Sequence, residues 1–406
     1  MSKEYKDLVV GLDIGTSRVT CLVAETRPEG ELSVVALGQQ LTNGALKRGV
    51  VVNIEATVDA ISKAVREAES MAGCTIREVY TGITGTHIKS YTANGMVAIN
   101  KGKEVTPYDV ERVLEVARAI SIPAEQGILH ILPQEFIIDG QGGIREPIGM
   151  SGAKLEVKAY IVTDAISAAQ NVVKCVRRCG LEAFDLILQP LASSFAVLTE
   201  DEKELGVCMI DIGGGTTDVA VFTQGVIRHI AVISEAGDFV TNDIAMGLHT
   251  PTARAEEIKI RHGVATHALV SPDETITIPG LGERPPRTLP LQGLTKIIEP
   301  RMTEIFESVL NELRRSGYEE LLSSGVVLTG GSALMTGMVE LADDIFHKPV
   351  RVGMPQCAGG GEVICRPQYS AAMGLVIEGA LQRRRGVQAR DTRGVKRVFS
   401  WVKSWF

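Results

Sequence analysis

Two stretches of this chain repeat one pattern: an apolar strand, an aspartate, a glycine-containing turn with hydroxyl side chains, and a second apolar strand. Residues 210–222 read IDIGGGTTDVAVF, and residues 9–23 read VVGLDIGTSRVTCLV. Glycine has no Cβ, so such a turn can reverse tightly and bring backbone N–H groups close to an anion. Because a strand resumes after each turn, both copies predict β-hairpins, not the strand-loop-helix of a Walker A or Rossmann turn.

The residue types in both turns suit a phosphate and its cation. Asp13 and Asp211 each end an apolar strand, where a carboxylate can hold Mg²⁺ directly or through waters. The expected phosphate donors are Gly15, Thr16 and Ser17 in the first turn and Gly213, Gly214, Gly215, Thr216 and Thr217 in the second. We align Thr16 with Thr216 and Ser17 with Thr217, which implies a glycine insertion in the second copy.

A single glycine hairpin of this kind can equally be an ordinary turn that binds no ligand, but the repetition favours a duplicated domain. Two such domains facing each other would place both aspartates on one cleft, with phosphates between them. The length of 406 residues is sufficient for two or more cores.

The composition narrows the class of protein. A 45% hydrophobic and 22% charged chain is typical of a globular protein. We find neither a signal-peptide pattern before Leu8 nor an 18-residue apolar run, and therefore expect a cytosolic protein. Residues 383–406 carry a net charge of +7, which leaves −14 on the rest of the chain. The acidic body argues against nucleic-acid binding, and the basic end favours an anionic surface.

The segments between the two copies predict a β-β-β-α-β unit followed by an insertion. A strand over 32–41, a helix over 53–71 and a strand over 78–84 complete the first unit. Residues 84–163 then change pattern, with a strand-like 87–99 broken by a turn at Asn94-Gly95 and a helix over 106–119. We interpret this block as a small inserted subdomain.

Gln189 lies where a strand over 184–188 meets a helix that Pro190 opens. An amide at such a junction can orient an attacking water toward a γ-phosphate. A surface glutamine before a proline is an equally good interpretation of this residue alone.

Three later motifs are candidates for the nucleoside. Gly237 opens a helix, and Glu256 and Lys259 share one face of the next, either as a solvated ion pair or close to a ribose and adenine. A strand over 326–329 ends in Gly330, Gly331 and Ser332, and we expect a helix to begin at Ala333. A sugar and α-phosphate could approach the backbone there.

In order, the motifs DIGTS at 13–17, QPLASS at 189–194, DIGGGTTD at 211–218, TGGSALMTG at 329–337 and AAMGL at 371–375 resemble those of the actin, Hsp70 and sugar-kinase superfamily. Within it, the chain is most similar to the FtsA family of bacterial cell-division proteins. That similarity rests on GLDIGTSRV, the insertion at 84–163, AEEIKIRHG, IIEPR at 297–301 and the C-terminal segment. The resemblance implies an α/β, actin-like ATPase fold: two ribonuclease-H-like domains flanking a nucleotide cleft, with an inserted 1C subdomain.

The resemblance also implies subdomain bounds. Subdomain 1A would comprise 1–83, 164–200 and 370–382, and subdomain 1C would comprise 84–163. Subdomain 2A would comprise 201–246 and 301–369, and subdomain 2B would comprise 247–300. A basic linker over 383–394 would precede a membrane-targeting helix over 395–406.

Residue roles and partners follow from the same resemblance. ATP and Mg²⁺ would bind between the turns, with Asp13, Asp211 and Gln189 as the catalytic group. Hsp70 proteins carry a glutamate where this chain has Gln189, so we expect at most weak ATPase activity. The implied partners are other copies in actin-like filaments, the C-terminal peptide of the tubulin-like division protein FtsZ, and further division proteins that would contact subdomain 1C. Lys296 and Arg301 are our electrostatic candidates for meeting an acidic FtsZ peptide.

The last twelve residues form an amphipathic pattern. At about 100° per residue, one arc of roughly 160° is apolar and the rest is basic or hydroxylic. The apolar arc holds Val395, Val398, Phe399, Trp401, Val402, Trp405 and Phe406, and the basic positions are Lys396, Arg397 and Lys403. A helix of about 18 Å is too short to span a hydrocarbon core of about 30 Å, so this segment predicts a helix lying in the interface of an anionic membrane. Docking of the same segment onto the protein's own core is the alternative.

The function we expect is therefore an ATP-binding, filament-forming membrane tether at the cytoplasmic face of the bacterial division site. A small-molecule kinase of the same fold and a PilM-like pilus assembly protein are the alternatives. Against a kinase, we find no aspartate base in a recognisable sugar-site motif. An Hsp70-like chaperone is disfavoured because no substrate-binding domain follows residue 381.

Overall fold

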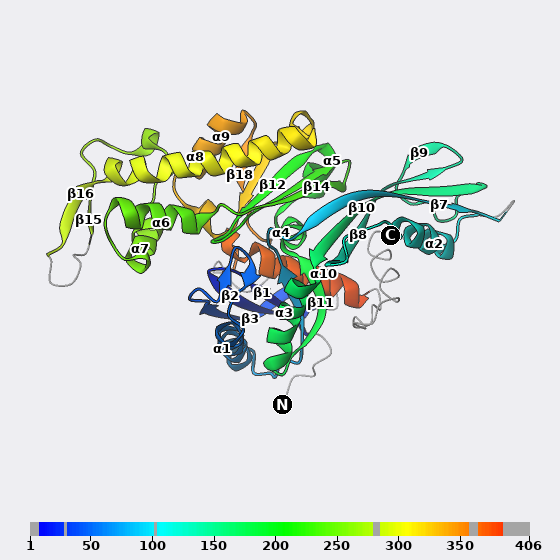
Figure 1. Ribbon diagram of the computed structural model, residues 1–406, viewed down its shortest axis with the longest axis horizontal. Helices are drawn as coiled ribbons and strands as arrows, with labels where there is room; N and C mark the ends of the chain where they lie inside the picture. The colour runs from blue at the N-terminus through cyan, green and yellow to red at the C-terminus, as the bar shows by residue number, and fades with distance from the viewer. Residues whose placement is uncertain (1–7, 28–30, 101–103, 279–284, 357–363, 385–406) are drawn as a thin grey trace.

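The computed structural model describes residues 8–27, 31–100, 104–278, 285–356 and 364–384 (Figure 1). Two five-stranded sheets have the same topology. The first has the order β3-β2-β1-β6-β11 and the second the order β14-β13-β12-β17-β18. Their bounds are β1 Leu8–Ile14, β2 Arg18–Thr26, β3 Leu32–Leu41, β6 Glu78–Ile83, β11 Glu182–Leu188, β12 Val207–Ile212, β13 Thr217–Thr223, β14 Val226–Ile233, β17 Val326–Thr329 and β18 Val350–Val352.

The strand pairing explains why the sequence repeats. β1 pairs antiparallel with β2 and parallel with β6, and β12 pairs antiparallel with β13 and parallel with β17. Each glycine turn therefore joins the central strand of a sheet to its antiparallel neighbour. The predicted duplication is present in the fold, and the two turns occupy equivalent positions in it.

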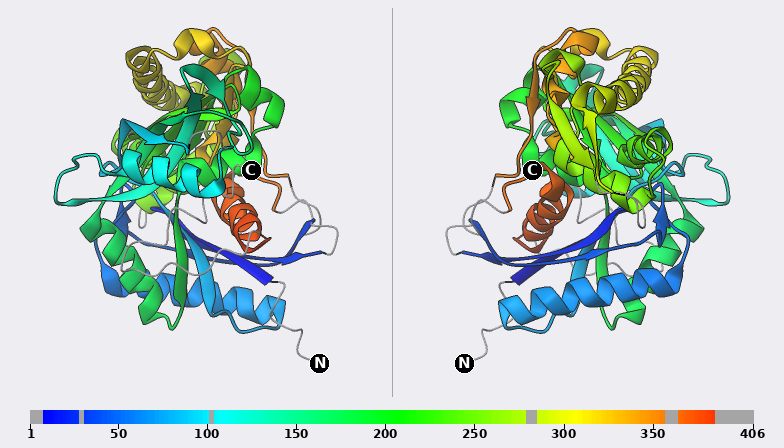
Figure 2. Two further views of the ribbon diagram at one scale, coloured as in Figure 1. Left: turned by 90° about the vertical axis from the view of Figure 1, so that its right-hand side faces the viewer. Right: turned by 90° about the vertical axis from the view of Figure 1, so that its left-hand side faces the viewer.

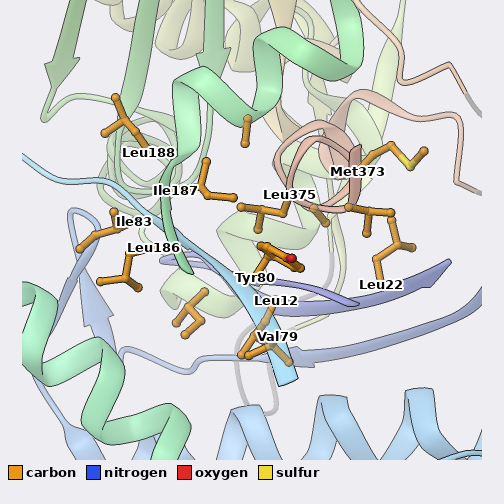
Figure 3. Packing of buried hydrophobic residues seen from close by; sticks show 14 of the residues in the cluster. Leu12, Leu22, Val79, Tyr80, Ile83, Leu186, Ile187, Leu188, Met373 and Leu375 are labelled. Atoms are coloured by element: carbon orange, nitrogen blue, oxygen red, sulfur yellow. The ribbon is translucent and has the colours of Figure 1, made fainter. Parts of the chain in front are cut away.

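Helices cover both faces of the first sheet. α1 Ile54–Ala72 and α3 Ile166–Arg178 lie on one side, and α4 Gln189–Val197 and α10 Ser370–Arg384 lie between this sheet and the second domain (Figure 2). Figure 3 shows Leu375 of α10 packed above Leu12 of β1 and Tyr80 of β6. A Cβ on Gly374 would lie 1.8 Å from the carbonyl oxygen of Ala192, so this glycine allows α10 and α4 to cross closely.

The second domain carries α5 Glu200–Leu205, α6 Gly237–Gly247, α7 Thr252–His262, α8 Leu291–Ser316 and α9 Met338–Phe346, with a small hairpin of β15 Thr275–Ile278 and β16 Arg287–Pro290. The long helix α8 begins at Leu291 and continues through Pro300. Pro300 is exposed. The helix tolerates it because solvent can satisfy the carbonyl group that loses its backbone donor.

The insertion forms a separate sheet of order β7-β10-β8-β9, which extends away from both domains (Figure 1). Its elements are β7 Lys89–Ala98, α2 Pro107–Arg118, β8 Gln126–Ile138, β9 Gln141–Ile144 and β10 Lys154–Ala165. Outside the insertion, a two-stranded ribbon of β4 Leu46–Lys47 and β5 Val50–Val51 lies before α1. The predicted turn at Asn94-Gly95 is wrong, because β7 runs straight through both residues. A Cβ on Gly95 would lie 2.0 Å from the carbonyl oxygen of Val113, so the glycine permits close packing of α2 on the strand.

Across the described residues, no helix is both long enough and apolar enough to cross a membrane.

Candidate functional site

The two glycine turns have equal lengths. Asp13 pairs with Thr20 across the first hairpin, and Asp211 pairs with Asp218 across the second. The Gly15 N–H donates to the Arg18 carbonyl at 3.0 Å, and the Gly213 N–H donates to the Thr216 carbonyl at 2.9 Å. The predicted glycine insertion is therefore wrong. Residue types suggested that alignment, but hairpin register is set by the hydrogen bonds that close the turn.

The corrected alignment pairs Thr16 with Gly214 and Ser17 with Gly215, and the structure brings these four residues into contact. A Cβ on Gly214 would lie 1.9 Å from Ser17 Oγ, and a Cβ on Gly215 would lie 2.4 Å from Thr16 Oγ1. Each hydroxyl side chain of the first turn thus lies against a glycine of the second. The hydroxyl groups of the first turn and the glycine backbone of the second turn therefore meet at one place.

Three carboxylates gather beside this contact, including Asp218, which we did not predict. Burial raises the pKa of Asp13 to about 7, assisted by the negative charge of Asp211 and opposed by a hydrogen bond from Gln189. Burial likewise raises the pKa of Asp211 to about 6. Burial, followed by the charge of Asp211, raises the pKa of Asp218 well above its usual range. Carboxylates held together out of water favour protonation or a cation.

Helix α4 supplies a hydrogen-bond donor to the aspartate of each turn. Gln189 Nε2 donates to Asp13 Oδ1 at 2.5 Å, and one helical turn later Ser193 Oγ donates to Asp211 Oδ2 at 2.6 Å. Gln189 is the first residue of α4, so its predicted strand-to-helix position is confirmed. We did not predict Ser193, although its spacing of four residues from Gln189 places both on one helical face.

Asp218 has its own partner across the domain boundary. Thr84 Oγ1 lies 2.9 Å from both Asp218 oxygens. Thr84 follows β6 of the first domain and Asp218 lies in β13 of the second, and both residues are buried. The bond therefore joins the two domains beside the turns. Asp218 is the last residue of the DIGGGTTD motif, but nothing in the sequence pattern connects it with Thr84.

The residues expected near a nucleoside surround the second turn. Lys259 Nζ donates to the Gly237 carbonyl at 3.0 Å and pairs with Glu256 at 2.7 Å. The Gly237 N–H donates to the Gly213 carbonyl at 3.1 Å, and Ser332 Oγ donates to the same carbonyl at 3.2 Å. The structure thus brings α6, α7 and the segment after β17 to one edge of the turn.

The helix expected from Ala333 is absent at that position. Gly331–Leu334 forms a single 3₁₀ turn, and α9 starts only at Met338. Gly330 has φ 86°, and a Cβ there would lie 2.3 Å from Asp211 Oδ1. Only glycine fits this position, because the backbone is left-handed and approaches a carboxylate. The segment therefore offers a close backbone approach but no α-helix N-terminus.

The two candidate contacts for an acidic peptide differ. Lys296 is exposed on α8. The Arg301 side chain donates to Asp243 at 2.6 Å, also pairs with Glu304, and lies over the Phe239 ring at 5.5 Å. Arg301 thus fastens α8 to α6, which leaves Lys296 as the better placed of the two. All the apolar and basic positions predicted for membrane contact, from Val395 to Phe406, lie outside the described residues.

The carboxylates of this site suit a magnesium ion whose remaining ligands are waters and phosphate oxygens. Among the side chains that the structure describes, no group of three or more His, Cys, Asp or Glu is arranged to hold a metal ion by itself. Mg²⁺ commonly binds through one or two carboxylates and completes its shell with waters and phosphate oxygens. Asp13 and Asp211 could supply those carboxylates.

Comparison with known proteins places the chain in a family. A family model described as "Cell division protein FtsA" matches residues 208–374, and one described as "SHS2 domain inserted in FTSA" matches residues 85–163. A cell division protein FtsA of Pseudomonas aeruginosa is 56% identical over 92% of this chain and 89% of its own length. A cell division protein FtsA of Escherichia coli is 42% identical over 98% of this chain and 97% of its own length.

Solved structures share the fold at low identity. A PilM-PilN type IV pilus biogenesis complex has a TM-score of 0.67 at 19% identity and covers 92% of this chain and 98% of the matched one. MreB5 of Spiroplasma citri bound to ADP has a TM-score of 0.52 at 15% identity, over 93% and 95% of the two chains. A MamK double helical filament has a TM-score of 0.53 at 13% identity, over 91% and 98%. The fold is therefore actin-like, and the identities to the curated relatives show that the chain belongs to the FtsA family of cell division proteins.

Proposed function

We propose that this chain binds Mg–ATP between its two glycine turns, polymerises in an actin-like manner, and tethers FtsZ filaments to the cytoplasmic face of the cell membrane during division. The observation that carries the nucleotide part is the contact of the two turns, with Asp13 and Asp211 beside it. The ADP bound to MreB5 and the filament formed by MamK, both of the same fold, support nucleotide binding and self-assembly.

Each group of residues has a role in this proposal. Mg²⁺ bound by Asp13 and Asp211 would neutralise phosphate charge. The N–H groups of Gly214 and Gly215 and the hydroxyls of Thr16 and Ser17 would hold the phosphates. Gly15 and Gly213 would shape the turns with Thr216 and Thr217, because the N–H groups of these two glycines close the hairpins. Gly237, Glu256, Lys259 and residues 330–332 would border the nucleoside. We also propose the subdomain bounds given above, with 2B carrying the FtsZ peptide near Lys296 and 1C available to other division proteins.

Slow turnover follows from the setting of Gln189. Its amide already donates to Asp13 at 2.5 Å, so it is held in place and carries no charge at neutral pH. A neutral amide can orient a water but is a poor proton acceptor. The site is better suited to nucleotide-dependent assembly than to rapid hydrolysis.

The membrane part rests on the amphipathic pattern of residues 395–406 and on multivalency. A single short interfacial helix binds weakly, but a filament presents many such helices at once. Linking them raises avidity by roughly 10²–10⁴ without any new contact. ATP-dependent assembly and membrane attachment would then reinforce each other.

Sedimentation with anionic lipid vesicles tests the proposal. We expect ATP to increase the fraction of full-length protein that pellets with vesicles, and deletion of residues 395–406 to abolish pelleting. The matched control is Asp13→Asn, which keeps the tail and should retain only the weak, ATP-independent fraction. Undiminished pelleting of the deletion variant, or an identical ATP response in Asp13→Asn, would contradict the proposal.

A further inference from the structure

A cavity of about 600 Å³ lies where the inserted sheet, the first domain and the second domain meet. Its walls come from β8, α4, α5, β13, the start of β14 and the end of α10. The volume is within the range of about 300–1,000 Å³ that ligand pockets show. Its apolar lining includes Phe136, Leu191, Phe195, Phe222, Val226 and Leu381. None of these residues belongs to the site between the glycine turns.

The charged lining of this cavity is strongly acidic. Six acidic residues line it, namely Glu135, Glu146, Glu200, Asp201, Glu204 and Glu378, against two basic residues, Arg145 and Lys203. Both basic side chains are already paired, Arg145 with Glu204 at 2.8 Å and Lys203 with Glu200 at 2.8 Å. The lining residues therefore have a formal charge of −4, and one of the six acids, Glu135, is also paired with Lys158 outside the lining at 2.5 Å. An apolar floor with an acidic rim favours an occupant that is both aromatic and basic.

This chain carries such a segment directly after the cavity wall. Leu381 lines the cavity, and α10 ends at Arg384, about 4.5 Å further along the helix axis. Residues 385–406 contain six Lys or Arg and one Asp, a charge of +5. The ten residues 385–394 can span up to about 33–36 Å, so residues 395–406 can reach the cavity.

We propose that, without lipid, residues 395–406 dock into this cavity of their own chain. Their aromatic side chains would contact the apolar lining near Phe195 and Leu381, which are partly exposed, and their basic side chains would face the acidic rim. A short tether gives an effective concentration of about 1 mM, so a docking constant of about 0.1 mM would fill the cavity in roughly nine molecules of ten. Weak contacts are therefore sufficient.

Docking uses the same aromatic residues that membrane insertion needs, so the two states exclude each other. This competition rests on the proposed function, whereas docking itself does not. The cavity walls belong to three parts of the molecule, so a change in their relative positions would alter its shape. The docked tail would keep unassembled protein off the membrane.

Tryptophan fluorescence tests docking directly, because the two tryptophans of the chain, Trp401 and Trp405, both lie in the tail. In lipid-free, full-length protein we expect blue-shifted emission and weaker acrylamide quenching than in a synthetic peptide of residues 385–406. The double substitution Glu146→Lys and Asp201→Lys should weaken docking roughly tenfold and shift emission to the red. Asp343→Lys with Asp344→Lys on α9, which does not line the cavity, is the matched control.

Carbodiimide crosslinking of the unmodified chain gives an independent readout, since it joins nearby lysines and carboxylates. We expect links from Lys396 or Lys403 to the acidic rim, within single chains and independent of protein concentration. Emission and quenching equal to those of the free peptide, or links formed only between chains, would overturn docking. Vesicle binding by a protein with exposed tryptophans would refute docking but leave the proposed function intact. A docked tail in a protein that never binds vesicles would support docking and contradict the proposed membrane attachment.

Discussion

The two glycine turns are closed by the same hydrogen-bond pattern but carry different residues at their two central positions. Each is closed by one hydrogen bond, from Gly15 to Arg18 at 3.0 Å and from Gly213 to Thr216 at 2.9 Å. The first turn carries hydroxyl side chains at its two central positions, and the second carries glycines there. Because the two turns are in contact, the side chains of the first turn leave no room for side chains at the central positions of the second. Duplication supplied two equal turns, and the contact between them favours different residues in each.

The aspartates of the two turns differ in a similar way. Asp13 receives its hydrogen bond from an amide and has a pKa of about 7, because of its burial and the charge of Asp211. Asp211 receives its bond from a hydroxyl, and its pKa is about 6. The two aspartates therefore differ in the group that donates to them, while burial raises the pKa of both. The predictions that follow address these two differences in order of expected effect.

The contact between the turns predicts unequal effects of alanine at the two glycines. A Cβ on Gly215 would lie 2.8 Å from the branched Cβ of Thr16, which cannot move by side-chain rotation. A Cβ on Gly214 meets mainly Ser17 Oγ, at 1.9 Å, and that hydroxyl can rotate away. We expect Gly215→Ala to cost about 2–3 kcal/mol and Gly214→Ala about 1 kcal/mol or less.

Urea unfolding of the nucleotide-free variants measures this difference. Adding Thr16→Gly to Gly215→Ala should recover part of the loss, because it removes the opposing side chain. Equal losses at the two glycines, or no recovery in the double variant, would show that the turns do not pack as described.

The raised pKa values predict that the nucleotide-free protein gains stability as the pH falls from 7.5 to 6. The pKa values of Asp13 and Asp211 in the fold, about 7 and about 6, exceed the ordinary value of 3.8. Between these values the folded state binds more protons than the unfolded state, so stability decreases as the pH rises through this window. The gain on acidification should be on the order of 1–3 kcal/mol.

Thermal unfolding across this pH range, repeated with Asp13→Asn, separates this contribution from other titrating groups. The amide that replaces the carboxyl group is uncharged at every pH, so the variant should be more stable than the parent at pH 7.5 and less sensitive to pH. A variant with the full pH dependence of the parent would rule out Asp13 as its source.

Replacing the amide donor by a carboxylate tests the difference between the two aspartate partners. Gln189→Glu places a second carboxyl group about where the amide now lies, 2.5 Å from Asp13 Oδ1. We expect a loss of about 1–2 kcal/mol at pH 8 that largely disappears at pH 6, where the pair can share a proton. Gln189→Met is the control, since it removes the hydrogen bond without adding charge. The same pH dependence in both variants would contradict the charge explanation.

The smallest expected effect concerns the second turn alone. Ser332→Ala removes one hydrogen bond, of 3.2 Å, to the Gly213 carbonyl, which still accepts from the Gly237 N–H at 3.1 Å. The loss should be about 0.5–1 kcal/mol in thermal unfolding. A loss above about 2 kcal/mol would mean that Ser332 supports more than this one carbonyl.

The sequence predicted the duplicated fold because glycine turns and apolar strands are local signals. It misaligned the turns because Thr16 resembles Thr216 in type, whereas hairpin register depends on pairing that residue types do not show. Asn94-Gly95 signals a turn equally well, but the packing of α2 explains that glycine. Thr84 and Asp218 become site residues only through a contact between elements distant in sequence. Such contacts leave no periodic pattern.

Hydrogen exchange of the full-length protein, with and without Mg–ATP, tests the central claim most directly. If the turns hold one nucleotide from both sides, amides of residues 15–18 and 213–216 should gain protection together, at the same nucleotide concentration. The strands that flank each turn provide the internal reference, since they should be protected in both states. Protection of one turn alone, or of neither at saturating Mg–ATP, would contradict a two-sided clamp.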